Sequence, residues 1–201
     1  ICMRIERMKN MKKLPLLLFL FYVLAVPSLK ARIGTFYTSE RELSSSLINM
    51  VYQDQRNYIW IATEDGLNKY DGVRFIQYKN ESNNPKTIKN NYVRTLFEDS
   101  SERFWVGCIN GLLFYNRATD DFTEVPLYNN GQLITPHITS ITEGKNRDIW
   151  IATSGEGIIR IKAEDETFKT EASLTQRLSS IYLTKVFQDS KGIIWIASEN
   201  Q

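Results

Sequence analysis

Few side chains in this chain of 201 residues have the chemistry of a catalytic or metal centre. It holds one histidine, His137, and two cysteines, Cys2 and Cys108. A Cys/His zinc cluster needs more soft ligands than these, and a His-centred catalytic triad would depend entirely on His137. That histidine follows Pro136 and has no Ser or Cys in a recognisable nucleophile elbow nearby. We therefore predict no catalytic residue, no metal site and no cofactor in this chain.

Three aspartates at matching positions, Asp54, Asp99 and Asp189, could gather a cation through their carboxylates. Each follows a short apolar run where the chain turns, and an aspartate there commonly accepts hydrogen bonds from the backbone amides of its own turn. The corresponding position in a further copy of the pattern is Gly144, which weakens the metal interpretation. The pattern favours turn capping.

Aromatic side chains are the other candidates for ligand contact, because their faces can stack on sugar rings. The four tryptophans each lie between apolar neighbours, which is typical of a core wedge rather than a binding platform. Four tyrosines on connecting segments are better candidates, and they are Tyr37, Tyr92, Tyr128 and Tyr182. Cys108 stands where the other copies have Thr63, Thr153 and Ser198, so we expect a small buried side chain rather than a nucleophile.

A strict internal repeat underlies these positions. The tryptophans Trp60, Trp105, Trp150 and Trp195 follow one another at intervals of 45 residues. An apolar residue flanks each of them on both sides, and a small residue comes next. A glycine recurs shortly afterwards as Gly66, Gly111 and Gly157, the third copy carrying one extra residue. Internal repeats of this length indicate a tandem array of structural units.

Each unit consists of short strands. In the first copy the apolar runs cover residues 48–53, 58–63, 67–70 and 74–78, and turn residues separate them. In the second copy we expect the third strand over residues 111–115 and the fourth over residues 122–127. Asp71 and Gly72 mark a tight hairpin before the last run. Four strands repeated about every 45 residues are the signature of a β-propeller blade, and the pattern lacks helical periodicity. We predict an all-β fold, a β-propeller built of four-stranded antiparallel blades that is incomplete in this chain.

The N-terminal region has the form of a secretory signal peptide. Lys12 and Lys13 precede an apolar stretch over residues 14–26, and Ala31 offers a small residue for cleavage. The stretch is short for a membrane span, so we expect cleavage rather than anchoring. We assign residues 1–31 to the signal peptide, with read-through upstream of Met11, and residues 32–201 to the partial propeller.

The composition limits the class of protein and the kind of partner that can be expected. Hydrophobic residues make up 42% of the chain and charged residues 24%, which is close to the globular average. The formal charge is only +2, too small for the electrostatic footprint of a protein that binds phosphate backbones. Nucleic acid is therefore not an expected partner.

Two stretches carry a family resemblance. Both resemble the two-component regulator propeller repeat. The first consists of residues 91–99, 104–107, 111–112 and 115–116, and the second of residues 59–72. The resemblance covers residues 47–201 and is to the periplasmic sensor region of Bacteroidetes-type hybrid two-component sensor histidine kinases. It implies that this chain is the front end of such a sensor, followed in the parent by further blades, downstream sensor domains, a membrane span and a kinase core.

The resemblance implies a periplasmic, ligand-sensing role with no enzymatic activity in this segment, an oligosaccharide as the ligand, and a homodimer of the parent. Two alternatives stay open. One is a propeller enzyme of the lyase or dehydrogenase type, which would need paired acids or a His/Arg/Tyr cluster at the central channel. The other is a purely structural propeller that binds another protein.

Overall fold

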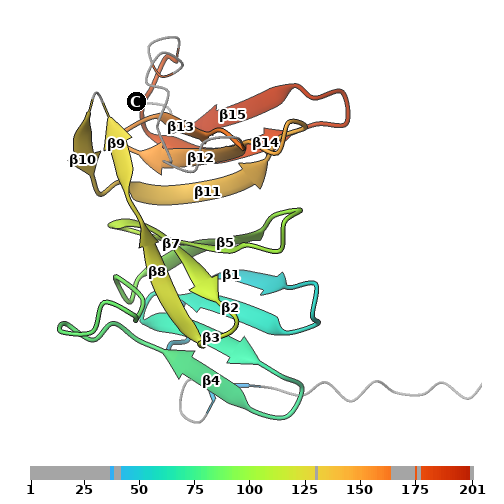
Figure 1. The fold of residues 1–201 in the computed structure, drawn as a ribbon, viewed down its shortest axis with the longest axis vertical. Helices are drawn as coiled ribbons and strands as arrows, with labels where there is room; N and C mark the ends of the chain where they lie inside the picture. The colour runs from blue at the N-terminus through green and yellow to red at the C-terminus, as the bar shows by residue number, and fades with distance from the viewer. Residues whose placement is uncertain (1–36, 39–41, 130, 164–174, 176–177, 200–201) are drawn as a thin grey trace, which may run out of the picture. The chain divides into compact units, whose positions relative to one another are not determined.

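The structure is a computed structural model that describes residues 37–38, 42–129, 131–163, 175 and 178–199. The expected signal peptide, residues 1–31, lies outside these residues. The described part of the chain folds into antiparallel β-sheets that follow one another along the sequence (Figure 1). Among the described residues there is no helix with the length and hydropathy needed to cross a membrane.

The first sheet has the strand order β1-β2-β3-β4, with every neighbouring pair antiparallel. Its strands are β1 (Ile48–Gln53), β2 (Ile59–Thr63), β3 (Gly66–Tyr70) and β4 (Phe75–Tyr78). These bounds differ by at most one residue from the sequence prediction. The predicted hairpin joins β3 to β4, where Asp71 Oδ1 accepts hydrogen bonds from the backbone amides of Val73 and Arg74, both at 2.8 Å.

The same topology recurs in the later sheets. The second sheet has four strands in order, the third has three among the described residues, and the fourth has two. The second sheet consists of β5 (Val93–Glu98), β6 (Phe104–Cys108), β7 (Gly111–Asn116) and β8 (Asp121–Val125); the third of β11 (His137–Glu143), β12 (Ile149–Ser154) and β13 (Ile158–Ile161); the fourth of β14 (Leu183–Gln188) and β15 (Ile194–Ser198). Every tryptophan lies on the second strand of its sheet, so the propeller prediction is confirmed.

One strand boundary predicted from sequence is wrong. The run over residues 122–127 was expected to be a single outer strand, but β8 ends at Val125 and a separate strand, β9 (Leu127–Asn129), pairs with β10 (Gln132–Ile134). Pro126 stands at the break and has no amide hydrogen for the ladder, so the strand cannot continue through it.

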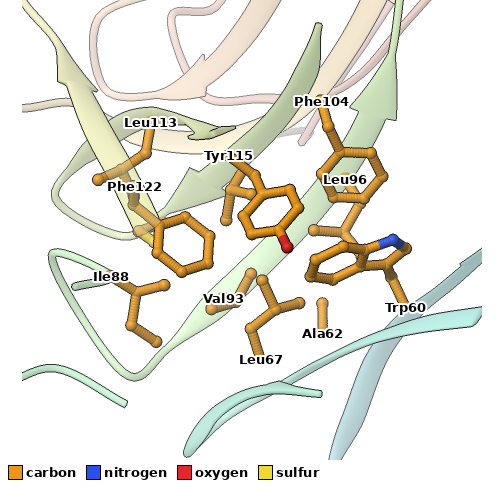
Figure 2. Packing of buried hydrophobic residues seen from close by; sticks show 12 residues of the cluster. Trp60, Ala62, Leu67, Ile88, Val93, Leu96, Phe104, Leu113, Tyr115 and Phe122 are labelled. Carbon is orange, nitrogen blue, oxygen red and sulfur yellow. The ribbon is translucent and has the colours of Figure 1, made fainter. Parts of the chain in front are cut away.

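Successive sheets pack face to face through alternating side chains. Trp60 is fully buried in a cluster with Phe104 and Val106 of the second sheet, while Trp105, between those two residues in sequence, belongs to the next cluster with Ile149 and other residues of the third sheet. Figure 2 shows Trp60 close to Phe104 and Tyr115, and the ring centroids of Trp60 and Tyr115 are 4.8 Å apart. The two faces of β6 therefore serve two different blade interfaces, as period-2 alternation requires.

The connections between blades also contribute to the core. Ile88, between β4 and β5, is fully buried in the cluster that holds Leu67 of the first sheet and Leu113 of the second. Leu43, one period earlier, is 5% exposed, and Leu178, two periods later, packs against the cluster of the third and fourth sheets. Each of these residues precedes the first strand of its own blade and fills the space beside it.

The last described sheet leaves large apolar side chains uncovered. Trp195 is 59% exposed, whereas Trp60 and Trp105 are fully buried. Phe187 of β14 and Ile193, just before β15, are also exposed. At the other end of the described array the exposed apolar side chains belong to Leu47, Ile48 and Val51, and Trp60 is not among them because it faces the second sheet.

Candidate ligand-binding site

The first strands of successive blades lie next to one another. Strand β5 contacts β1 and β11, and β11 contacts β14. Each of these strands begins at or directly after a position that repeats every 45 residues. We call the end of the strands at which these positions lie the leading end. These positions hold Leu47, Tyr92, His137 and Tyr182. Chemically different side chains therefore occupy equivalent places on neighbouring strands.

Each first strand has the same irregularity beside its leading end. The pairing register with the second strand shifts between Ile48 and Met50 in the first blade, and at the equivalent place in the other three. The residues at the shift are Asn49, Arg94, Thr139 and Thr184. A β-bulge leaves one residue out of the ladder and re-aims its side chain, often next to a functional site.

Two of these bulge residues join blades. Asn49 Nδ2 donates a hydrogen bond to the carbonyl of Val93 in the next blade at 2.8 Å. Thr139 Oγ1 donates in the same way to the carbonyl of Leu183, also at 2.8 Å. The bulge thus directs a side-chain donor at a backbone acceptor of the following first strand.

Arg94 occupies the bulge of the second blade and is arranged differently. Its side chain is exposed, and its Nη1 lies 3.5 Å from Asn49 Oδ1 on the preceding blade. Arg94 therefore brings a positive charge and several hydrogen-bond donors to the surface of the leading end.

His137 begins β11 and pairs with Ser154. Its Nε2 is buried, and among the described residues it has no hydrogen-bond partner. Burial lowers the pKa of His137, and the positive charge of Arg94 lowers it further, while the carboxylate of Glu199 opposes them. The imidazole is therefore held in its neutral form at neutral pH.

Acidic residues border the leading end in two blades. Glu64 and Glu199 occupy equivalent positions, and their backbone amides donate to the carbonyls of Leu47 and Tyr182 at 3.1 and 3.0 Å. The hydroxyl of Tyr92 donates to Glu64 Oε1 at 3.2 Å, which links the second blade to the first.

The four tyrosines predicted as ligand candidates separate into different places. Tyr92 and Tyr182 both lie at the leading end, and Tyr182 is 37% exposed. Tyr128 lies on β9 and is 38% exposed. Tyr37 packs against Tyr70 and Phe75 of the first sheet, with ring centroids 5.4 and 5.0 Å away. Their ligand role stays a prediction.

Sequence reasoning did not single out Arg94 as a site residue and considered His137 only as a catalytic group. The signal was present in the repeat, because placing the four copies in register puts an arginine where the others have Asn or Thr. The β-bulge that directs the Arg94 side chain toward the surface cannot be predicted from the residue types.

The repeated aspartates lie at the opposite end of the first strands. Asp54 Oδ1 accepts hydrogen bonds from the amides of Arg56 and Tyr58 at 3.0 and 2.9 Å, and its Oδ2 accepts from Trp60 Nε1 at 2.9 Å. The equivalent indole bonds of Asp99 and Asp189 measure 2.9 and 3.0 Å. Both oxygens of each carboxylate are thus engaged by the turn and the tryptophan. Among the described residues, no group of three or more His, Cys, Asp or Glu side chains is placed to hold a metal ion.

An ion network joins the first two blades at that end. Arg117 Nη1 lies 2.9 Å from Asp54 Oδ2, and its Nη2 lies 2.6 Å from Glu98 Oε1. Glu98 Oε2 in turn accepts from the amide of Gln55 in the preceding blade at 2.7 Å. Burial raises the pKa of Asp54, but its hydrogen bonds to Trp60 and Arg117 outweigh this and hold the pKa below its ordinary value.

Cys108 is fully buried, and burial raises the pKa of its thiol to about 12. The thiolate, which is the reactive form, is therefore scarce at neutral pH.

Two clefts of about 560 and 440 Å³ lie beside the connection over residues 79–91. Both are lined by Asn84, Lys86 and Phe122, but Phe122 is only 2% exposed and offers no free ring face. The ion pairs Lys86–Asp121 and Lys89–Glu124 span this region. The other aromatic ring beside the smaller cleft, Tyr78, is half-buried, and its hydroxyl donates to Asp120 Oδ1 at 2.7 Å.

Comparison with known proteins agrees with the architecture. The family model of the two component regulator propeller matches residues 42–65 and 87–110, which include the first two strands of the first two blades. A curated protein called Histidine kinase P4, from Formosa agariphila, is 32% identical over 98 residues, which are 46% of this chain and 7% of that protein.

Solved structures resemble most of the chain. The extracellular domain of a hybrid two component system from B. thetaiotaomicron has a TM-score of 0.70 and 27% identity, covering 82% of this chain and 24% of that one. A second such domain from the same organism has a TM-score of 0.67 and 20% identity, covering 85% and 23%. Virginiamycin B lyase from Staphylococcus aureus shares the fold, with a TM-score of 0.52 and 17% identity over 75% of this chain and 48% of the lyase. The chain thus spans a small part of the sensor proteins that it resembles.

Proposed function

Because this chain carries two-component regulator propeller repeats, we propose that it is an extracytoplasmic ligand-sensing segment of a two-component sensor and that its signal is an oligosaccharide. The observation that carries this proposal is the leading end of the first strands. There the repeat presents Tyr92, Arg94, His137 and Tyr182 side by side, on a rigid sheet scaffold. Aromatic rings with a charged group and an imidazole between them are side chains that can recognise sugar rings and their hydroxyl groups.

The relatives support the proposed location and the proposed parent protein. The B. thetaiotaomicron structures are extracellular domains of two component systems, and the F. agariphila relative is called a histidine kinase. We infer that this segment lies in the periplasm after export by the leader, and that the remaining blades, downstream sensor domains and kinase belong to the parent chain. The parent works as a homodimer in this proposal.

In this proposal the segment binds the ligand and catalyses no reaction. Cys108 is buried with a raised pKa, and the Nε2 atom of His137 forms no hydrogen bond with Ser154, its partner across the ladder, or with any other described residue. Ligand binding at the leading end would act on several first strands at once, because neighbouring blades are joined there by side-chain bonds such as that of Asn49.

A binding experiment with two matched tyrosines tests the site. A panel of neutral and acidic oligosaccharides is titrated into the protein by isothermal calorimetry, and each binder is retested with Tyr182→Ala and Tyr128→Ala. The two tyrosines have almost equal exposure, 37% and 38%, so their removal perturbs the fold to a similar degree. We expect Tyr182→Ala to weaken binding about tenfold, equivalent to about 1.4 kcal/mol, and Tyr128→Ala to bind as the parent sequence does.

Binding that survives Tyr182→Ala but is lost with Tyr128→Ala would place the site on the β9–β10 hairpin instead. No binding by any oligosaccharide in the panel would contradict the proposed ligand class.

A further inference from the structure

The bulge residue of the second blade is arranged differently from the bulge residues of the first and third blades. In the first and third blades the bulge residue donates a hydrogen bond to the next blade, through Asn49 and Thr139. Arg94 holds the same position but reaches back toward Asn49 and stays exposed. The second blade therefore uses a position that stabilises blade packing elsewhere to present a guanidinium group to solvent.

A second polar group, on the neighbouring first strand, has no hydrogen-bond partner among the described residues. The Nε2 atom of His137 is buried and forms no hydrogen bond with any described residue. Buried polar atoms in native proteins are nearly always satisfied, so an orphaned one next to a surface site calls for a partner from outside the chain. His137 begins the strand adjacent to that of Arg94.

The charges around His137 decide which partner fits. The charged or titratable groups that border this part of the leading end are Arg94, Glu64, Glu199, Tyr92 and Tyr182. The carboxylate of Glu64 is engaged by the hydroxyl of Tyr92. Arg94 lowers the pKa of the imidazole and Glu199 opposes this more weakly, so both charges act on the ring. The guanidinium of Arg94 is exposed and its hydrogen bond to Asn49 is long at 3.5 Å, so its remaining donors favour an anion.

We propose that Arg94 and the Nε2–H of neutral His137 together hold an anionic group of the ligand, a carboxylate or a sulfate ester on an acidic oligosaccharide. Arg94 supplies the counter-charge and can bind a carboxylate or sulfate through two parallel hydrogen bonds. His137 supplies one further donor and orients the group toward Tyr92 and Tyr182. This inference rests on the proposed function and narrows its ligand class from oligosaccharides in general to acidic ones.

The single histidine of the chain provides a direct measurement. Its ring resonances in a nitrogen-correlated NMR spectrum report on His137 alone, because the sequence holds no other histidine. The pKa of His137 is measured with galacturonate, with galactose 6-sulfate and with galactose, each at the same ionic strength. A bound anion stabilises the imidazolium form, so we expect both acidic sugars to raise the pKa of His137 and galactose to leave it unchanged.

Variants separate the charge of Arg94 from its bulk. Arg94→Gln removes the positive charge, so the pKa of His137 in the free protein should rise and its response to both acidic sugars should disappear. Arg94→Lys keeps the positive charge but loses the planar guanidinium that can form two parallel hydrogen bonds, so part of the pKa shift of His137 with acidic sugars should remain. Arg147→Gln is the matched control, because Arg147 is exposed in the turn between β11 and β12 and its loss changes the net charge equally.

The outcomes distinguish this inference from the proposed function. If galactose shifts His137 as much as the acidic sugars do, or if Arg94→Gln responds as the parent sequence does, the anion site is wrong. A response to only one acidic sugar identifies the carboxylate or the sulfate as the recognised group. Neutral oligosaccharide binding that depends on Tyr182 but leaves His137 unaffected would overturn the anion site and leave the sensor proposal standing.

Discussion

Replacing Trp105 and Trp195 separately by alanine compares the same residue at the same repeat position in two environments. Trp105 is fully buried between the second and third blades, and its indole donates to Asp99 Oδ2 at 2.9 Å. Trp195 makes the equivalent bond to Asp189 at 3.0 Å but is 59% exposed. The local hydrogen bond is matched, so the difference between the two variants reports the blade interface together with the contact of Arg103 on the Trp105 ring, for which Trp195 has Ile193 instead.

The burial sets the expected magnitudes. A fully buried tryptophan removes about 200 Å² from water, worth about 5 kcal/mol at roughly 25 cal/mol per Å². Measured losses for Trp→Ala in cores are about 3 to 5 kcal/mol, and we expect this range for Trp105→Ala. Trp195 has about two fifths of its surface buried and leaves no enclosed cavity when removed, so about 2 kcal/mol or less is expected from the same coefficient.

Urea unfolding followed by far-ultraviolet circular dichroism measures both losses without relying on tryptophan fluorescence. Equal losses for the two variants would refute the reasoning, since they would show that the indole's own hydrogen bond, rather than the next blade, carries the stability. A Trp105→Ala protein with unchanged stability and abolished sugar binding would instead make the tryptophan a ligand platform.

Three further changes and one reporter fusion test other parts of the structure. Gly107→Ala should cost about 1 to 3 kcal/mol, because a Cβ there would lie 2.6 Å from Ile138 Cγ2, and urea unfolding unchanged by it would contradict this packing. With the leader cysteine removed, Cys108 should not react with a thiol reagent at pH 8 until urea is added; prompt labelling would show that its burial is transient. The pKa of Asp54 is lower in the folded protein than its ordinary value of 3.8, so the ionised carboxylate stabilises the fold above that pH, and this stabilisation is lost as the pH falls through the folded pKa. The difference in unfolding free energy between the parent sequence and Asp54→Asn should therefore shrink below about pH 4. A difference that stays constant with pH would mean that the charge of Asp54 is unimportant for stability. A reporter fused to residues 1–40 should be exported and cleaved near Ala31, and its retention in the cytoplasm would remove the leader from the proposal.

The fold was predictable because it repeats. The 45-residue spacing of the tryptophans places each on the second strand of a sheet, and the hairpin at Asp71 and Gly72 is a local signal that needs no tertiary information. The break at Pro126 was missed although proline signals are local, because the apolar residues on both sides of it resemble one continuous strand.

The candidate site was only partly predictable. Tyr92 and Tyr182 could be selected because they fall outside the repeated core, but Tyr37 meets the same criterion and packs against the first sheet instead. The role of Arg94 depends on a register shift, which is a property of two paired strands and has no counterpart in residue type. The contact between Arg117 and Asp54 joins residues 63 positions apart, beyond the reach of any local pattern.

The buried residues of the connections bear on how such proteins change size over evolutionary time. Ile88 precedes the first strand of the second blade in sequence, yet it fills the interface between that blade and the one before it. A gene segment that encodes this connection together with the second blade thus also encodes packing against the first blade, whereas the equivalent residue before the third blade, Leu133, is 61% exposed. Unequal recombination that adds or deletes a 45-residue unit with a buried connecting residue like Ile88 then inserts a blade together with part of the surface that packs against its neighbour. The number of blades becomes a heritable variable that can change in a single genetic event without redesign of the neighbouring core.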